Sequence, residues 1–212
     1  MTSAPALAID GRNARARRTR EAVAEGFLDL VQSGVLRPTA VQVAARAGVS
    51  ERAVFRHFDD LESLYAAVAE RQMQRVAPRV SPVPRGGPLG ERIAALVAHR
   101  VDLYERITPV RRASLLQEHF SPVVARRLTW MRDALRTEVA GVFAPELAVL
   151  PAATRREVLD ALGAAASWSA WENLRRHARL PRARAQRAVI RTIAVLLATP
   201  PAGAAQGRPL HK

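Results

Sequence analysis

The segment TAVQVAARAGVSERAVFRHFDDLESL, residues 39–64, restricts the fold of this chain more than any other stretch. Thr39 can cap a helix through its side-chain oxygen, and Gln42 stands at the reciprocal capping-box position. Small apolar residues then recur at helical spacing: Ala40, Val43, Ala44 and Ala47. Gly48 suits the left-handed conformation that ends a helix sharply, and Ser50 is the next N-cap. The pattern predicts two short helices joined by a tight turn, which is the layout of a helix-turn-helix.

The second of these helices is predicted to have an apolar face and a polar face. Three residues are expected to face inward: Val49, Val54 and Phe58. Four are left on or near the outward face: Arg52, Ala53, Phe55 and Arg56. Two arginines and an aromatic side chain on that face favour insertion of the helix into the major groove of DNA. In the alternative interpretation, the charged residues of a three-helix core are only solvated.

A further helix is predicted to start after Asp59 or Asp60, either of which can act as its N-cap. Its buried stripe is expected to consist of Leu61, Leu64, Tyr65 and Val68.

Residues 17–72 resemble the N-terminal domain of the TetR family of bacterial transcription regulators. The family pattern, in loose form, is T-V-x-x-I-A-x-x-A-G-V-S-x-G-T-L-Y-x-H-F-x-x-K-x-x-L. This chain matches it at Thr39, Val43, Ala44, Ala47, Gly48, Val49, Ser50, His57, Phe58 and Leu64, with conservative changes at Val54 and Phe55. The resemblance implies an all-α fold with an N-terminal three-helix helix-turn-helix domain and a C-terminal helical ligand-binding and dimerisation domain.

The chain departs from the family at positions that commonly contact DNA phosphates. A Gly-Thr pair in the family is Arg52-Ala53 here, a lysine is Leu61, and a tyrosine is Phe55. We hypothesise that Arg52 and Arg56 compensate, because arginine binds guanine O6 and N7 or a phosphate through two parallel hydrogen bonds. The residues expected to contact DNA are Arg37, Thr39, Ser50, Arg52, Ala53, Phe55, Arg56 and His57.

The net charge of +14 is compatible with a nucleic-acid partner, but it is not concentrated in the helix-turn-helix. Residues 1–60 hold nine arginines and seven acids, a net +2, whereas residues 181–212 hold six basic and no acidic residues, a net +6. The chain has no cysteine, which excludes disulfides and thiolate metal sites. Because no apolar signal core and no membrane-spanning stretch is evident, we expect a cytoplasmic protein.

Composition divides the chain into five segments. Residues 1–16 are expected to be a disordered basic arm that runs into the first helix, Thr19–Gln32. Its arginines could contact DNA or could merely keep the protein in solution. The helix-turn-helix domain is expected over residues 17–77, a Pro/Gly-rich loop over 78–90, the helical effector-binding and dimerisation domain over 91–199, and a flexible tail over 200–212.

The second domain is expected to contain only helices. Prolines and apolar periodicity predict one helix from Glu91 to Ile107, ending before Pro109, and then helices over 110–120, 124–142, 153–178 and 181–199. In the family, the last two long helices of each subunit form a dimer interface. Apolar residues of this chain permit the same: Leu159, Leu162, Ala166, Ala170, Leu174, Val189, Ile190, Ile193, Val195, Leu196 and Leu197. The alternative is that these residues are buried within the monomer.

Family members usually hold an effector pocket among the middle helices. The candidates for such a pocket are His99, Arg100, Leu103, Tyr104, His119, Phe120, Trp130, Met131, Trp168 and Trp171. They fit a mostly apolar pocket for a small apolar or cationic–apolar ligand, and they equally fit an ordinary core.

Together these features predict a dimeric repressor that binds a palindromic operator in double-stranded DNA and is released by a small molecule. The alternatives are a regulator controlled by a protein partner, without a small-molecule ligand, or an activator. The five histidines show no metal-binding spacing, and neither a nucleophile elbow nor a phosphate loop occurs. We therefore expect no cofactor, no metal and no enzymatic activity.

Overall fold

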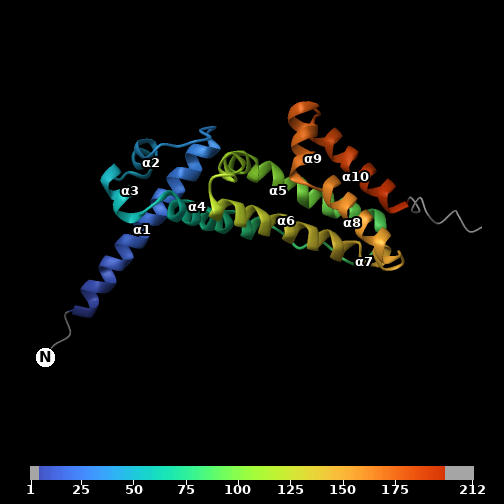
Figure 1. Ribbon diagram of the computed structural model, residues 1–212, viewed down its shortest axis with the longest axis horizontal. Coiled ribbons are helices and arrows are strands. Elements are labelled where there is room, and N and C mark those ends of the chain that lie inside the picture. The colour runs from blue at the N-terminus through green and yellow to red at the C-terminus, as the bar shows by residue number, and fades with distance from the viewer. Residues whose placement is uncertain (1–4, 199–212) are drawn as a thin grey trace, which may run out of the picture. The chain divides into compact units, whose positions relative to one another are not determined.

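A computed structural model of the protein describes the backbone of residues 5–198 and the side chains of residues 13–198. Within these residues the regular structure is helical and contains no strand, so the all-α prediction is confirmed. The chain divides into two compact units (Figure 1). The first holds the residues up to Val80 together with Arg106–Trp130, and the second holds Ser81–Glu105 together with the residues from Met131 onward. No described helix has an apolar stretch sufficient to span a bilayer.

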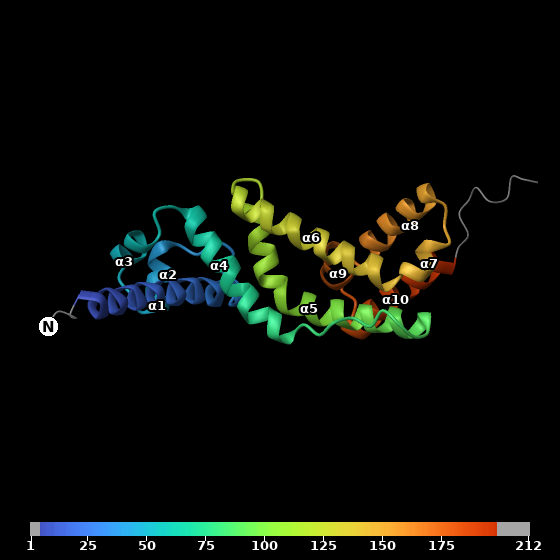
Figure 2. The same ribbon diagram turned by 90° about the horizontal axis from the view of Figure 1, so that it is seen from below.

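Four helices and one short 3-10 turn open the first unit. They are α1 (Pro5–Gln32), α2 (Ala40–Ala47), α3 (Glu51–His57), α4 (Leu61–Val76) and the turn Ala77–Arg79. Helix α1 packs against α2, α3 and α4 (Figure 2). The helix-turn-helix therefore rests on α1, with α3 following α2 after a short turn.

Helix α1 starts earlier than predicted. Its first residue is Pro5, so the segment from residue 5 to residue 16 is helical and not a disordered arm; residues 1–4 lie outside the described part of the chain. Thr19 does not cap the helix, because its hydroxyl donates to the Arg15 carbonyl one turn earlier, at 3.1 Å. Six of the twelve residues from 5 to 16 are alanine or arginine, which are good helix formers, and proline suits a first helical turn.

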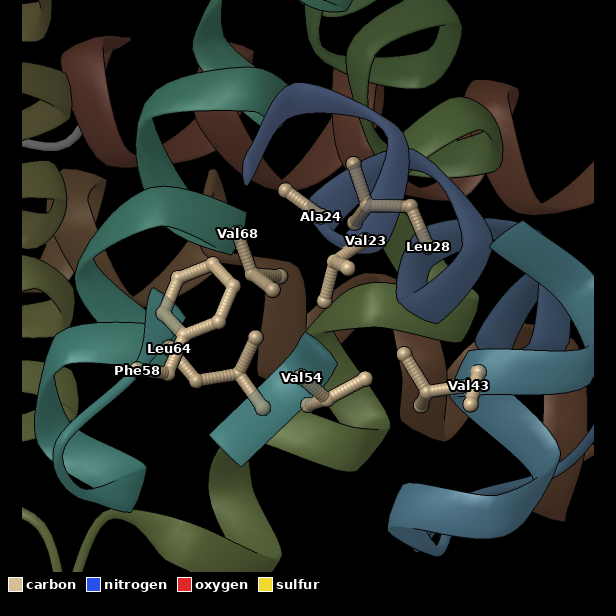
Figure 3. Close-up of a cluster of buried hydrophobic side chains, with 9 residues drawn as sticks. Val23, Ala24, Leu28, Val43, Val54, Phe58, Leu64 and Val68 are labelled. Carbon is tan, nitrogen blue, oxygen red and sulfur yellow. The ribbon is translucent and has the colours of Figure 1, made fainter. Parts of the chain in front are cut away.

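The core of the first unit is a cluster of apolar side chains from α1 to α4 (Figure 3). Its buried members are Val23, Ala24, Leu28, Val43, Ala44, Val54, Phe58, Leu64 and Val68. Gly26 lets α2 approach α1 closely, since a Cβ at this position would lie 3.1 Å from the Ala47 backbone nitrogen. Small residues at this crossing thus set where α2, and with it α3, lies on α1.

Helix α5 (Leu89–Gln117) continues through Pro109, contrary to the prediction of a break there. Proline removes one backbone donor, but residues on both sides of it are held by burial, among them Ile107 and Ala113. Val110 packs against the core of the first unit, and this contact explains why residues 106–130 belong to that unit. The division therefore differs from the boundary expected in the 78–90 loop.

Helix α6 (Pro122–Val142) begins in the first unit and is tied to α4 there. The Val123 backbone N–H donates to Glu62 Oε2 at 2.9 Å, and the Val124 N–H donates to Ser121 Oγ at 3.1 Å. A carboxylate and a hydroxyl thus satisfy two amides that the first helical turn leaves without partners.

The second unit combines the first part of α5 and the last part of α6 with the helices that follow. These are α7 (Ala144–Ala148), α8 (Ala152–Ala165), α9 (Trp168–Glu172), the π-helical turn Asn173–His177 and α10 (Arg182–Ala198). Helix α10 packs on α8. Its end at Ala198 matches the predicted last helix up to Thr199, which lies outside the described residues.

The prediction of a single helix over residues 153–178 is wrong, because helix α8 ends at Ala165. Ser167 caps a new helix by accepting from the Ala170 N–H at 3.1 Å. The hydroxyl of buried Tyr104 donates to the Ala166 carbonyl at 2.6 Å. A cap and a tertiary hydrogen bond therefore replace the helical hydrogen bonds that the break removes.

Candidate nucleic-acid interface

The start of α2 has the predicted capping box. Thr39 Oγ1 accepts from the Gln42 N–H at 3.3 Å, and the Thr39 N–H donates to Gln42 Oε1 at 2.9 Å. Both residues are exposed. The N-terminus of α2, where backbone N–H groups and the helix dipole favour an anion, is therefore open to a phosphate.

The turn between α2 and α3 also has the predicted geometry. Gly48 adopts the left-handed conformation with φ 67° and ψ 32°, and the Val49 N–H donates to the Ala44 carbonyl at 3.0 Å. Ser50 caps α3, since its Oγ accepts from the Ala53 N–H at 3.2 Å. That bond uses the oxygen of the exposed Ser50 hydroxyl and leaves its hydrogen to donate to a phosphate.

Helix α3 presents three large side chains to solvent: Arg52, Phe55 and Arg56. The side chain of Phe55 is 63% exposed, an unusual state for a phenylalanine. Neither arginine forms an ion pair within residues 13–198, and Arg37 in the loop before α2 is exposed as well. The combination matches a major-groove reader, because arginine pairs with guanine and an apolar ring contacts the thymine methyl group.

Two predictions about this region are wrong. Ala53 is only 8% exposed, because it lies beside Val54 on the side of α3 that faces the core. It is therefore not on the outward face and does not present a side chain to DNA. Leu61 is 64% exposed instead of buried, because it is the first residue of α4 and precedes the turn that packs inward through Leu64.

Arg20 of α1 holds the end of α3 in place, a contact that the sequence did not predict. Its guanidinium lies 4.4 Å from the centroid of the Phe58 ring and donates to the carbonyl of His57. His57 itself is half-buried at the last position of α3. The sequence places Arg20 within a run of arginines, and nothing in that run distinguishes an inward-facing member from the exposed ones.

Other arginines of the first unit are paired with acidic residues. Glu25 binds Arg71 and Arg75, and Asp29 binds Arg75 at 2.6 Å and Arg46 at 3.2 Å. Burial raises the pKa of Glu25, but hydrogen bonds from Arg75 and Arg71 outweigh this and lower it. A hydrogen bond from Arg75 is the main cause of the lowered pKa of Asp29. These arginines join α1 to α2 and α4, so the unpaired positive charge of the helix-turn-helix is that of Arg37, Arg52 and Arg56.

The candidate pocket residues fall into the two units. His119, Phe120 and Trp130 belong to the first, and Phe120 is 72% exposed. Its ring packs edge-on against His119, and the Arg127 guanidinium lies 4.4 Å from the Trp130 ring centroid.

The other candidates belong to the second unit: His99, Arg100, Leu103, Tyr104, Met131, Trp168 and Trp171. Tyr104 and both tryptophans are buried, and Trp171 Nε1 donates to Glu105 Oε1 at 3.1 Å. His99 and Arg100 are neighbours on α5 and lie close to Glu138 of α6, with which Arg100 pairs. The aromatic residues thus serve packing and hydrogen bonding in this unit.

Comparison with protein-family models and with curated proteins finds no match. Solved structures do match. A transcriptional regulator from Rhodococcus sp. Rha1 aligns with a TM-score of 0.64 and 22% identity over 86% of this chain and 95% of its own. A TetR-family transcriptional regulator from Streptomyces coelicolor aligns with a TM-score of 0.66 and 24% identity over 85% of this chain and 80% of its own. The predicted architecture is confirmed: the protein has the fold of a TetR-family transcriptional regulator.

Proposed function

We propose that the protein is a sequence-specific DNA-binding transcription regulator of the TetR type. The observation that carries this proposal is the helix-turn-helix itself, in which two capped helices meet at Gly48 and α3 exposes Arg52, Phe55 and Arg56. The two structural neighbours, both transcriptional regulators, support it through the shared fold.

We further propose that the protein acts as a homodimer on a palindromic operator. Helix α10 has a buried stripe formed by Ala185, Val189 and Ile193 and a second, partly exposed apolar stripe formed by Ile190, Ala194 and Leu197. A two-fold dimer through α8 and α10 presents two copies of α3 to half-sites ~34–36 Å apart, or a multiple of that distance.

The regulatory part of the proposal is repression that a small molecule relieves. The ligand binds in the second unit and changes the spacing of the two α3 helices, so that both half-sites no longer fit. Such a coupling typically amounts to ~1–3 kcal/mol, a 5- to 150-fold change in affinity by order of magnitude. It has to be tested separately from DNA binding, because a regulator without a ligand binds its operator equally well.

The decisive experiment is the selection of genomic fragments bound by the purified protein. We expect enrichment of a palindromic sequence, and a loss of affinity of about 1–3 kcal/mol for either Arg52→Ala or Arg56→Ala. Arg106→Ala is the matched control, since this exposed arginine of the first unit lies on α5, outside the helix-turn-helix. If all three variants bind the selected fragments like the wild type, α3 does not read the operator.

A further inference from the structure

Two arginines of α5 are almost entirely buried in the second unit, and they differ in how they are satisfied. Arg92 is 5% exposed and Arg100 is 3% exposed. Every nitrogen of the Arg92 guanidinium has an acceptor. Nε donates to the Gly87 carbonyl at 3.0 Å, Nη1 donates to the Val142 carbonyl at 2.6 Å, and Nη2 pairs with Glu146. Arg92 thus joins the start of α5 to α6 and α7.

Arg100 uses only one of its three nitrogens. Nη2 donates to the Leu135 carbonyl at 2.8 Å and lies 2.8 Å from Glu138 Oε2. Nε and Nη1 are buried and have no acceptor among the described residues. Both ring nitrogens of neighbouring His99 are buried and without a hydrogen-bond partner too, and Nδ1 is 3.7 Å from Glu138 Oε2.

Such a cluster is unfavourable for a protein that binds nothing there. Each buried donor without an acceptor costs about 1–3 kcal/mol, and more when it is charged. The unused donors are Nε and Nη1 of Arg100 and one nitrogen of a neutral His99, and they outnumber the unused acceptors, which are Glu138 Oε2 and the other His99 nitrogen. A ligand that satisfies the cluster must therefore bring acceptor oxygens.

We propose that His99, Arg100 and Glu138 form a binding subsite for the carboxylate of an amphipathic small molecule. This rests on the proposed function, in which the ligand is the effector. A guanidinium recognises a planar carboxylate through parallel hydrogen bonds. Buried Val97, Val101 and Val139 flank the cluster on α5 and α6 and suit an apolar body. The side chain of Glu138 is 25% exposed although its Oε2 is buried, so the surface lies within one side chain of the cluster. The proposed ligand class is thus acidic and apolar, which differs from the small apolar or cationic–apolar ligand expected from the sequence.

Charge balance predicts that His99 takes up a proton when a carboxylate binds. Burial lowers the pKa of His99, Arg100 lowers it further, and Glu138 and Asp102, itself paired with Arg182 of α10, partly oppose this. His99 is therefore neutral in the free protein at neutral pH. A bound carboxylate adds one negative charge beside Arg100 and Glu138 and raises the pKa of His99. Carboxylate affinity then increases as the pH falls from about 7 to about 6, a range in which simple carboxylic acids remain almost fully ionised.

The test compares two carboxylates, octanoate and benzoate, with their neutral amides, octanamide and benzamide, by thermal unfolding and calorimetric titration of the full chain without DNA. We expect saturable stabilisation by at least one carboxylate, none by its amide, and proton uptake that grows below pH 7. Arg100→Met should lower carboxylate affinity roughly ten- to hundredfold. Arg100→Lys keeps the positive charge but loses the parallel pair of N–H donors of the guanidinium. It serves as the second variant if the methionine variant does not fold.

Arg92→Lys is the matched control, because it alters the other buried arginine of α5 and should leave carboxylate affinity unchanged. Equal responses to carboxylates and amides, no response to either carboxylate, or an unchanged affinity in both Arg100 variants overturns the proposal. Operator binding is measured separately. If the protein binds its operator but no carboxylate, the subsite proposal is wrong and the proposed regulator function stands. If it binds a carboxylate that does not change operator affinity, the subsite proposal stands and release of the operator by this ligand is excluded.

Discussion

Arg20 and Arg56 carry the same charge in the same unit, yet their surroundings give them different tasks. Arg20 stacks on Phe58 and donates to the His57 carbonyl, so its charge is directed into the protein. Arg56 is exposed on α3, and no described residue pairs with it. Arg20 therefore holds the end of α3 in place, whereas Arg56 is available for the DNA contact that we propose for α3.

The salt dependence of operator binding separates these two tasks. Arg56→Met should reduce the slope of log K against log salt by about 0.9, because one phosphate contact is lost if Arg56 neutralises a phosphate. Arg20→Met should destabilise the protein by about 1–3 kcal/mol and weaken binding without changing this slope. A slope that falls equally in both variants means that Arg20 contacts a phosphate directly and does not act through α3.

Phe55 should read thymine. The ring is 63% exposed, so Phe55→Ala should change the free energy of unfolding by less than about 0.5 kcal/mol. On DNA, contact with a thymine methyl group buries apolar surface worth about 0.8 kcal/mol, roughly a fourfold change in affinity. Replacing thymine by uracil in the operator, one position at a time, should weaken wild-type binding at one position in each half-site. The alanine variant should be insensitive to that replacement, and equal sensitivity of both proteins excludes the contact.

The residues that were predicted correctly from sequence are those whose partners are close in the chain. Thr39 and Ser50 cap helices by accepting from the backbone three residues later, so sequence spacing identifies them. Asp60 caps α4 in the same way, whereas the sequence left the choice between Asp59 and Asp60 open. Arg20 and Ala53 could not be placed in this way. The environment of Arg20 depends on its hydrogen bond to His57, which lies 37 positions away in the chain. The environment of Ala53 depends on which side of the seven-residue helix α3 packs inward.

Helix ends were predicted less well than helix caps: one predicted helix end does not occur, and one helix end that occurs was not predicted. Pro109 was expected to end a helix, but apolar packing on both sides carries α5 through it. The residues that directly follow Leu162 include no proline, yet helix α8 ends at Ala165. There Ser167 caps α9, and the Tyr104 hydroxyl donates to the Ala166 carbonyl. Tertiary contacts outweigh local propensity in both places.

The break between α8 and α9 should depend on one hydroxyl group. Tyr104→Phe leaves a buried carbonyl without its 2.6 Å hydrogen bond and should lower the free energy of unfolding by about 1–3 kcal/mol. The chain has one other tyrosine, Tyr65, which is only half-buried in the first unit and provides the control. Tyr65→Phe should change stability by clearly less. If denaturant unfolding shows equal effects for both variants, the Tyr104 hydroxyl does not stabilise the break.

At the scale of the whole molecule, the two apolar stripes of α10 differ in burial. Ala185, Val189 and Ile193 are buried within the second unit and belong to its own core. Ile190, Ala194 and Leu197 recur at steps of four and three residues and are only half-buried. A second stripe on one helix exceeds what a single core needs, and in a dimer it is the surface that the partner copy covers.

Ile190→Glu should therefore separate the subunits. A carboxylate in the centre of an apolar interface has no counter-ion, and its desolvation opposes association by several kcal/mol. Thr192→Glu adds the same charge at an exposed position of α10 and should leave the dimer intact. Sedimentation at micromolar concentration measures the first effect, and operator affinity measures its consequence, because a monomer reaches only one half-site of a palindrome. If the wild-type protein sediments as a monomer, the dimer is excluded. If the Ile190→Glu variant still sediments as a dimer, the interface lies elsewhere than on this stripe.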